Sequence, residues 1–169
     1  AASDVYKRQT GVTPLKASHY YYKQLSLKDG VTSAVRCILT DKQGFVWIGT
    51  KAGISRYDGH ELKKYVHSPN NPHSIPNNLI HQIAEDEMSN IWILTDKGIA
   101  RYQRQSDDFF LPTDEKGNPI IAYSTCLTKD GVLFGSKDKV YFYSYRDSSL
   151  RLLQKLNKGN NFNISLLSL

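Results

Sequence analysis

Two stretches of the sequence repeat each other without a gap. Residues 35–57 read VRCILTDKQGFVWIGTKAGISRY, and residues 80–102 read IHQIAEDEMSNIWILTDKGIARY. The offset is 45 residues, so Trp47 stands at the same place in the first unit as Trp92 in the second. A period of about 20–50 residues is typical of folds that stack similar units, each burying its faces against its neighbours. The period therefore limits the chain to a repeat architecture.

A third and weaker copy occupies residues 123–143. It keeps glycines at the matching places, but one residue is deleted between Gly131 and Gly135, and there is no tryptophan. The sequence thus predicts three copies of one structural unit, of which the third is degenerate. We assign structural roles to the residues that recur at equivalent positions, which are Asp41, Gly44, Trp47, Gly49, Gly53, Tyr57, Asp86, Trp92, Gly98, Tyr102, Gly131, Gly135 and Tyr143.

Each unit is predicted to consist of four short strands. In the first unit the runs 35–40, 45–50, 54–57 and 61–66 are separated by turns that contain Asp or Gly. Four short antiparallel strands in about 45 residues are the pattern of one blade of a β-propeller. Taken alone, residues 77–88 also fit an amphipathic helix, but their counterpart in the first unit does not, so the repeat predicts a strand and a turn.

The predicted fold class is all-β, a partial β-propeller of three four-stranded antiparallel blades plus the start of a fourth. The sequence has no initiator methionine and residues 1–17 match nothing downstream, so we expect a piece of a longer protein in which about the first nine residues are not native. An incomplete propeller leaves an apolar blade face uncovered, and we expect the isolated chain not to fold well on its own. The expected segments are a non-native or disordered leader (1–18), a lead-in strand from the closing blade (19–32), blades at 33–67, 78–111 and 121–156, and the first strand of a truncated blade (162–169).

The composition argues against several classes of function. The net charge is +6, but the Lys and Arg residues are scattered, so we expect this region to bind no nucleic acid. No apolar run approaches the roughly 18 residues that a membrane helix needs. Cys37 and Cys126 have no metal-ligand spacing and lie in largely apolar runs, where we expect both to be buried free thiols.

The tryptophans and the turn aspartates have predicted structural roles. Trp47 and Trp92 favour the core between blades, because a tryptophan can bury about 150–250 Å² there. The alternative is that a tryptophan face stacks on a sugar ring. Asp41 and Asp86 are expected to cap the turn between the first and second strands by accepting hydrogen bonds from backbone N–H groups.

Catalytic signatures are absent from the sequence. It contains no HExxH, GxSxG or dinucleotide-binding GxGxxG pattern. The acids at 85–87 and 107–108 are sequence neighbours, whereas glycosidases need two acids facing each other across a pocket. The histidines show no metal spacing, so we expect no metal and no cofactor. A lyase or hydrolase that uses a loop histidine such as His73 is one alternative.

Several segments resemble the two-component regulator propeller repeat. The resemblance rests on LSLKDGVTS (25–33), DKQGFVWIGT (41–50) and GISRYDG (53–59). The opening HYYYKQLSL (19–27) and the linker at 67–78 are similar to the start of the sensor region in hybrid two-component proteins of Bacteroidetes. The sequence departs from the repeat at Leu94, where the family has Gly, and in the third unit.

The resemblance implies a sensor rather than an enzyme. In that family a periplasmic region with seven-bladed propellers binds glycan breakdown products, and a membrane helix, a histidine kinase and a DNA-binding module follow. For this chain it implies an oligosaccharide ligand, the remaining blades of the same parent chain as partners, and contact with the membrane only through downstream segments. A homodimer, or a propeller that serves as a protein-interaction scaffold, is the alternative.

The geometry of a propeller nominates a ligand-binding rim. Ligands usually bind at the channel end where loops join the fourth strand of a blade to the next blade, and the second strand to the third. Lys and Arg there suit uronate or sulfate groups, while Asn and His bond hydroxyl groups. An ordinary polar rim is the alternative. The nominated residues are Arg36, Lys51, Asn77, Asn78, His81, Asp96, Lys97 and Lys137, with the 67–78 loop.

Overall fold

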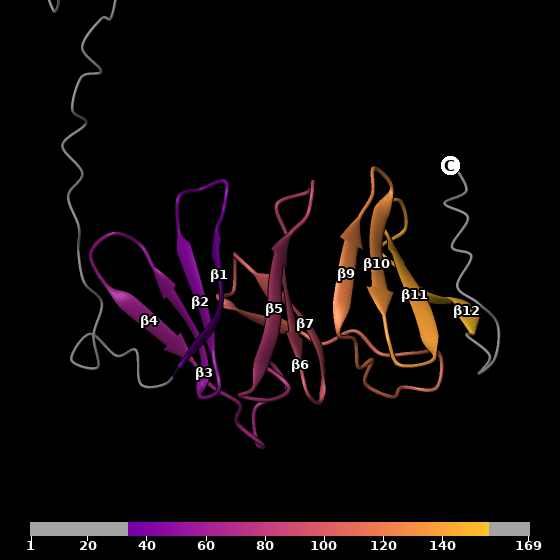
Figure 1. The fold of residues 1–169 in the computed structure, drawn as a ribbon, viewed down its shortest axis with the longest axis horizontal. Coiled ribbons are helices and arrows are strands. Elements are labelled where there is room, and N and C mark those ends of the chain that lie inside the picture. The colour runs from indigo at the N-terminus through magenta and orange to yellow at the C-terminus, as the bar shows by residue number, and fades with distance from the viewer. Residues whose placement is uncertain (1–33, 156–169) are drawn as a thin grey trace, which may run out of the picture.

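The computed structural model describes residues 34–155, and this part of the chain is all-β (Figure 1). Its strands form three four-stranded antiparallel sheets in which the strands follow chain order. The predicted leader (1–18), lead-in strand (19–32) and truncated blade (162–169) lie outside the described residues. No helix in the described part is long and apolar enough to cross a membrane.

Each sheet has the strand arrangement predicted for a blade. The first blade contains β1 (Val35–Thr40), β2 (Val46–Thr50), β3 (Gly53–Tyr57) and β4 (Leu62–Tyr65); the second contains β5 (Ile80–Glu85), β6 (Ile91–Thr95), β7 (Gly98–Gln103) and β8 (Asp108–Phe110); the third contains β9 (Ser124–Leu127), β10 (Gly131–Gly135), β11 (Lys139–Ser144) and β12 (Leu150–Lys155). The segment with the ambiguous helical pattern forms β5, because its side chains pack against a neighbouring sheet on each face.

The three blades stand side by side and enclose two apolar cores (Figure 1). Trp47 lies in the core between the first and second blades, and Trp92 in the core between the second and third. Each tryptophan meets a tyrosine of the following blade at the same geometry: Trp47 and Tyr102 have ring centroids 4.8 Å apart, as do Trp92 and Tyr143. The contacts of one unit are therefore repeated in the next.

The tryptophans have no exposed surface (0%) and are core residues, as predicted. The alternative that either of them stacks on a sugar is wrong, because a ligand cannot reach a fully buried ring. Asp41 and Asp86 cap the β1–β2 and β5–β6 turns through backbone N–H groups. Each carboxylate also accepts the indole N–H of its own tryptophan, at 3.0 Å from Trp47 and 2.8 Å from Trp92.

The spacing between blades depends on one repeat position. A Cβ on Gly49 would lie 2.5 Å from Sγ of Cys37 and 2.7 Å from Cγ2 of Ile80, so only glycine lets β5 approach β2 so closely. In the second blade Leu94 occupies this position and is fully buried in the core against the third blade. At the position where the family pattern has Gly, Leu94 therefore contributes its side chain to the core between the second and third blades.

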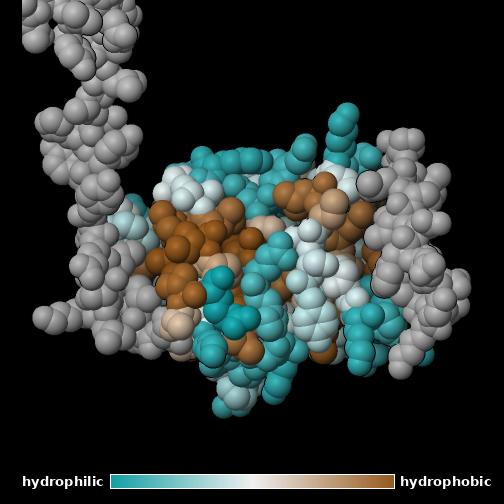
Figure 2. All heavy atoms as spheres, in the orientation of Figure 1, coloured by the Kyte–Doolittle hydropathy of each residue, from teal (hydrophilic) through white to brown (hydrophobic). Residues whose placement is uncertain are grey.

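Apolar side chains remain exposed on the first and third blades. Figure 2 shows brown surface gathered over the first blade, where Val35, Ile38 and Val66 are exposed, Ile38 by 64%. On the third blade, Cys126 and Leu153 are exposed. The prediction that both cysteines are buried is wrong for Cys126. Cys37 packs against the second blade, whereas the described residues place no blade against the corresponding face of the third.

Candidate ligand-binding site

In the first two blades, the pairing of the first strand with the second is irregular at its start, so that one residue of the first strand has no partner on the second. In the first blade Val35 pairs with Thr50 and Cys37 with Gly49, which leaves Arg36 as the extra residue. The second blade repeats this register shift, and there His81 is the extra residue. Such β-bulges re-aim a side chain and are frequent beside functional sites.

The third blade places Tyr123 at the same position. Ser124 pairs with Gly135, the counterpart of Gly49, and the N–H of Tyr123 donates to the carbonyl of Gly135 at 2.8 Å. In the sequence, the separation between Arg36 and Tyr123 equals that between Gly44 and its counterpart Gly131, so the alignment of the first and third units also pairs Arg36 with Tyr123. We call Arg36, His81 and Tyr123 the bulge residues. The sequence nominated two of them and missed the third.

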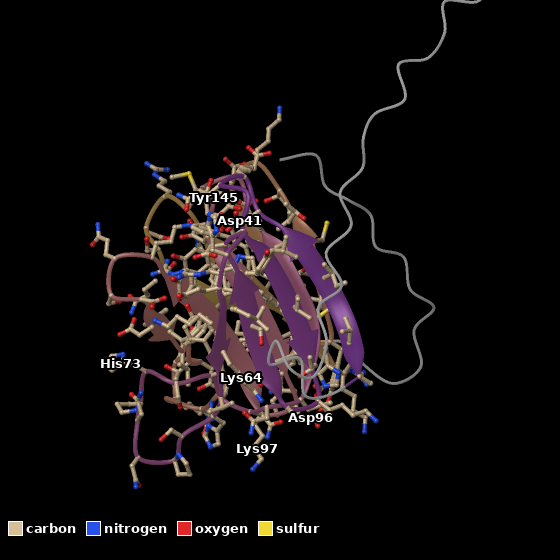
Figure 3. All side chains as sticks on the ribbon, turned by 90° about the vertical axis from the view of Figure 1, so that its left-hand side faces the viewer. Asp41, Lys64, His73, Asp96, Lys97 and Tyr145 are labelled. Atoms are coloured by element: carbon tan, nitrogen blue, oxygen red, sulfur yellow. The ribbon has the colours of Figure 1, made fainter. Side chains whose placement is uncertain are left out.

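All three bulge residues lie at one end of the blades, which we call the rim. Antiparallel order brings the beginnings of β1, β5 and β9 to the same end as the turns after β2, β6 and β10. These turns carry the exposed side chains of Lys51, Lys97 and Lys137. Figure 3 shows Asp96 and Lys97 at this end, and Asp41 and Tyr145 at the opposite end. The strand order thus places the lysines that the sequence nominated, Lys51, Lys97 and Lys137, at the same end of the blades as Arg36.

The bulge residues of the second and third blades form a connected group with Asp96. Nε2 of His81 lies 2.5 Å from Oδ1 of Asp96, and the side chain of His81 is 21% exposed. The rings of His81 and Tyr123 contact each other edge to face, with centroids 6.0 Å apart, and Tyr123 is 56% exposed. On the other side, Nε of Arg36 donates to the carbonyl of Ile80 at 3.0 Å. The rim therefore offers an aromatic face beside a fixed polar pair.

The two nominated asparagines stabilise the loop in which they lie. Oδ1 of Asn77 accepts the N–H of Leu79 at 2.8 Å, and Oδ1 of Asn78 accepts the N–H of His67 at 2.7 Å. The 67–78 loop is packed rather than open, since Ile75 is fully buried. Its His73 carbonyl accepts the N–H of Phe109 on β8, the last strand of the second blade. The structure thus fixes this part of the loop on the last strand of the second blade.

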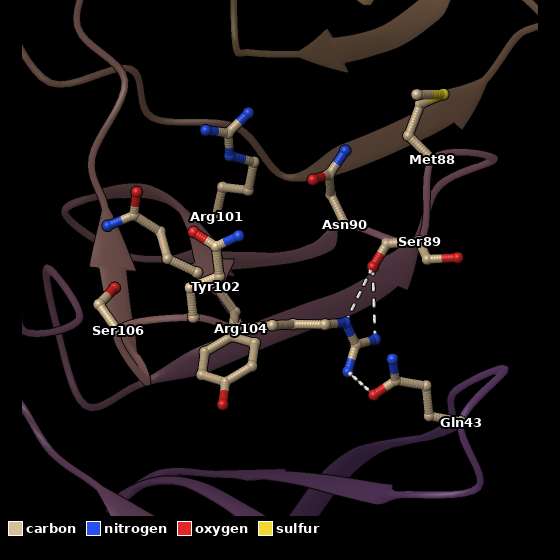
Figure 4. Close-up of a pocket in the computed structure, with 10 residues that line it drawn as sticks. Gln43, Met88, Ser89, Asn90, Arg101, Tyr102, Arg104 and Ser106 are labelled. Atoms are coloured by element: carbon tan, nitrogen blue, oxygen red, sulfur yellow. Dashed lines mark hydrogen bonds between the residues drawn. The ribbon is translucent and has the colours of Figure 1, made fainter.

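A polar hollow of about 520 Å³ lies away from the nominated residues (Figure 4). The guanidinium of Arg104 crosses its floor and donates to Gln43 at 2.8 Å, to Asp41 at 3.1 Å and to the carbonyl of Ser89 at 3.3 Å. The bonds to Gln43 and Asp41 join the second blade to the first, so the hollow is best described as a joint between blades. Its lining consists of Gln43, Met88, Ser89, Asn90, Arg101, Tyr102, Gln103, Arg104, Gln105 and Ser106.

A second polar joint is centred on Asp107, in the turn between β7 and β8. Its carboxylate accepts hydrogen bonds from Tyr65 and Tyr102 and pairs with Lys63 and Arg56 of the first blade. Burial acts to raise the pKa of Asp107, but the bonds from Lys63, Tyr102 and Tyr65 outweigh it and lower that pKa to about 2. Burial and the same carboxylate raise the pKa of Tyr65. This acid is a structural element and is held ionised.

The described part of the chain shows no candidate metal site. No group of three or more His, Cys, Asp and Glu side chains there is arranged to hold a metal ion. The acids at 85–87 and 107–108 include Asp86, which caps a turn, and Asp107, which joins two blades. The chemistry that the rim offers is hydrogen bonding, ionic contact and contact with an aromatic face.

The stacked four-stranded antiparallel sheets define the class of the protein as a β-propeller built from repeated blades. Residues 29–52 match the family Two component regulator propeller, so the chain carries this family's repeat. A curated relative, Histidine kinase P4 of Formosa agariphila, is 37% identical over 59 residues, which is 34% of this chain and 4% of the relative.

Solved structures share the fold. The extracellular domain of a putative hybrid two-component system from B. thetaiotaomicron has a TM-score of 0.58 and 23% identity, covering 82% of this chain and 17% of that one. An extracellular domain from the same organism, described as a putative one-component system, has a TM-score of 0.55 and 24% identity, covering 72% and 16%. The chain thus spans a small part of the proteins that it resembles.

Proposed function

We propose that this chain is part of the periplasmic sensor region of a hybrid two-component protein. Its propeller binds glycan-derived oligosaccharides and signals to a histidine kinase elsewhere in the parent protein. The propeller repeat at 29–52, the similarity to a histidine kinase and the extracellular neighbours support this proposal. The chain itself has no catalytic role in this account, and the rest of the propeller is its partner.

The observation that carries the proposal is the convergence of the three bulge residues at the rim. Each blade contributes one of them, so a single ligand can contact all three blades. His81 and Asp96 supply a hydrogen-bonding pair for hydroxyl groups. Arg36 and the turn lysines supply positive charge for uronate or sulfate groups. A few polar groups that converge beside an aromatic surface are typical of small-ligand sites.

The proposal is tested by calorimetric titration of the protein as its gene encodes it with neutral, uronate and sulfated oligosaccharides. We predict that one class binds, and that His81→Ala weakens its binding about five- to tenfold through the loss of a rim hydrogen bond. His60→Ala, an exposed histidine in the turn between β3 and β4, is the matched control and leaves affinity unchanged. Failure of every oligosaccharide to bind the unchanged protein would contradict the proposal.

A protein-interaction or dimerisation scaffold is the second candidate function. Val35, Ile38 and Val66 are exposed on the first blade, on a surface that either a partner molecule or a neighbouring blade would cover. Size-exclusion chromatography of the encoded protein, with and without the oligosaccharide panel, separates the two functions. A dimer that forms through these residues and ignores every oligosaccharide would favour the scaffold.

A further inference from the structure

Tyr123 is an exposed aromatic side chain that its surroundings hold in place. Its N–H is bonded to Gly135, which fixes the backbone at the entry to β9. Its ring rests edge to face against His81, and the pairing of His81 with Asp96 fixes that ring in turn. A surface that is ordered before binding loses little conformational entropy when a ligand arrives. Tyr123 is thus preorganised to present one face outward.

The repeat indicates that this face stays accessible in a longer propeller. His81 occupies the same position one blade earlier, and its ring contacts Tyr123 of the third blade. It nevertheless keeps 21% of its side chain exposed. A following blade would stand beside Tyr123 as the third blade stands beside His81. The position therefore faces the rim rather than the core between blades, in contrast to Trp47 and Trp92.

The surroundings of Tyr123 select the ligand chemistry. The face of an aromatic ring is electron-rich and attracts C–H groups or cations. Arg36 and Lys97 at the same rim repel a cation, and the nearby carboxylate of Asp96 is paired with His81, so a molecule with a C–H face and no positive charge is favoured. His81, whose ring contacts that of Tyr123, and its partner Asp96 can exchange hydrogen bonds with hydroxyl groups around the edge of such a molecule. A pyranose ring combines an apolar C–H face with hydroxyl groups around its edge.

We propose that Tyr123 is the stacking platform of a pyranose subsite between the second and third blades. The sugar ring lies on the exposed face of Tyr123, and its hydroxyl groups bond to His81 and Asp96. This inference rests on the proposed function, since it specifies where one residue of the oligosaccharide binds. It assigns to the rim a residue that carries no charge and that belongs to the degenerate third unit of the sequence.

The subsite is tested with Tyr123→Ala and Tyr123→Phe in the protein as its gene encodes it. The probes are cellobiose, maltose, lactose and trigalacturonate, with binding measured by calorimetry and by saturation-transfer NMR. For any probe that binds, Tyr123→Ala raises Kd about tenfold or more, because an aromatic contact of this kind is lost. Tyr123→Phe keeps the ring and stays within about twofold of the original Kd.

Phe110→Ala is the matched control, since it removes another exposed aromatic side chain from β8, the last strand of the second blade. It leaves the Kd of every probe unchanged. Unaltered binding by Tyr123→Ala would overturn the subsite and leave the proposed function standing. If no probe and no oligosaccharide of the wider panel bound the unchanged protein, both the subsite and the proposed function would fall. Equal losses in Tyr123→Ala and Tyr123→Phe would also overturn the stacking role.

Discussion

At the scale of single residues, the repeat is maintained by backbone conformation as well as by packing. Gly44 has a φ of 89° in the β1–β2 turn, and Ser89, at the matching place of the β5–β6 turn, has a φ of 60°. Side chains with a Cβ adopt this left-handed region at a cost of about 1–2 kcal/mol, which glycine avoids. The second blade therefore carries a strained residue where the first carries a relaxed one.

Ser89→Gly is predicted to stabilise the protein by about 0.5–1 kcal/mol, because it removes this strain at a small cost in backbone entropy. The reciprocal change, Gly44→Ala, destabilises by a similar amount through conformation alone, since no atom lies within 4 Å of the added Cβ. Urea unfolding of the encoded protein measures both changes. A loss of stability in Ser89→Gly would show that the serine side chain has another role.

Asp107 gives a prediction about pH. Its pKa is about 2 in the fold, below the usual value, so the unfolded chain takes up this proton first as the pH falls. Its contribution to stability is therefore complete above about pH 5 and is lost as the pH falls toward 2. We predict that the difference in unfolding free energy between the protein and Asp107→Asn is constant above about pH 5 and shrinks between about pH 4 and 2. A difference that stayed constant to pH 2 would contradict the ionised role.

At the scale of elements, one repeat position sets the separation of neighbouring blades. Gly49 leaves room for Ile80 of the second blade, whereas Leu94 fills the corresponding space beside the third. One polar contact recurs at both joints. The guanidinium of Arg56 donates to Tyr102 of the second blade, as that of Arg101 donates to Tyr143 of the third. Arg104 and Asp107 add further bonds between the second blade and the first.

Enlarging the side chain at Gly49 and shortening it at Leu94, the equivalent residue of the second blade, are both predicted to destabilise the protein. Gly49→Ala forces a Cβ against Cys37 and Ile80, which costs about 1–3 kcal/mol through overpacking. Leu94→Ala leaves a cavity in the second core and costs about 2–5 kcal/mol. Chemical unfolding of each variant in the encoded protein checks the pair. A neutral Gly49→Ala would mean that the first two blades are packed less closely than described.

Sequence reasoning predicted the blades well because their determinants repeat in place. The offset between Trp47 and Trp92 fixed the strand pattern and resolved the ambiguous β5, and the caps at Asp41 and Asp86 follow from local turn chemistry. It did not find Tyr123, because the rim candidates were chosen as charged or amide side chains, and only the contact with His81 shows that this tyrosine belongs to the same group. The joint at Arg104 depends on a long side chain crossing between blades, which no local pattern records.

At the scale of the whole molecule, the described blades are an open stack rather than a closed unit. Ile38 on the first blade and Leu153 on the third are both more than half exposed, at 64% and 59%. A blade needs neighbours on both faces, and a propeller closes with about four to eight blades. The number of blades beyond the three described here is a prediction from the family resemblance.

We predict that the 169-residue chain alone lacks a sharp cooperative thermal transition as a monomer, because apolar blade faces stay in contact with water. Circular dichroism melting combined with size-exclusion chromatography measures this directly. The protein as its gene encodes it serves as the comparison, and we predict that it melts cooperatively. A sharp monomeric transition in the short chain would show that three blades suffice.

The most direct test of the central claim is hydrogen exchange of the encoded protein, with and without a saturating oligosaccharide identified by calorimetry. The account predicts that protection rises at the rim, in peptides that contain Arg36, His81, Asp96 and Tyr123. Peptides lining the hollow around Arg104 keep their exchange rates. Protection around Arg104 with none at the rim would contradict the account, as would a bound oligosaccharide that protects neither region.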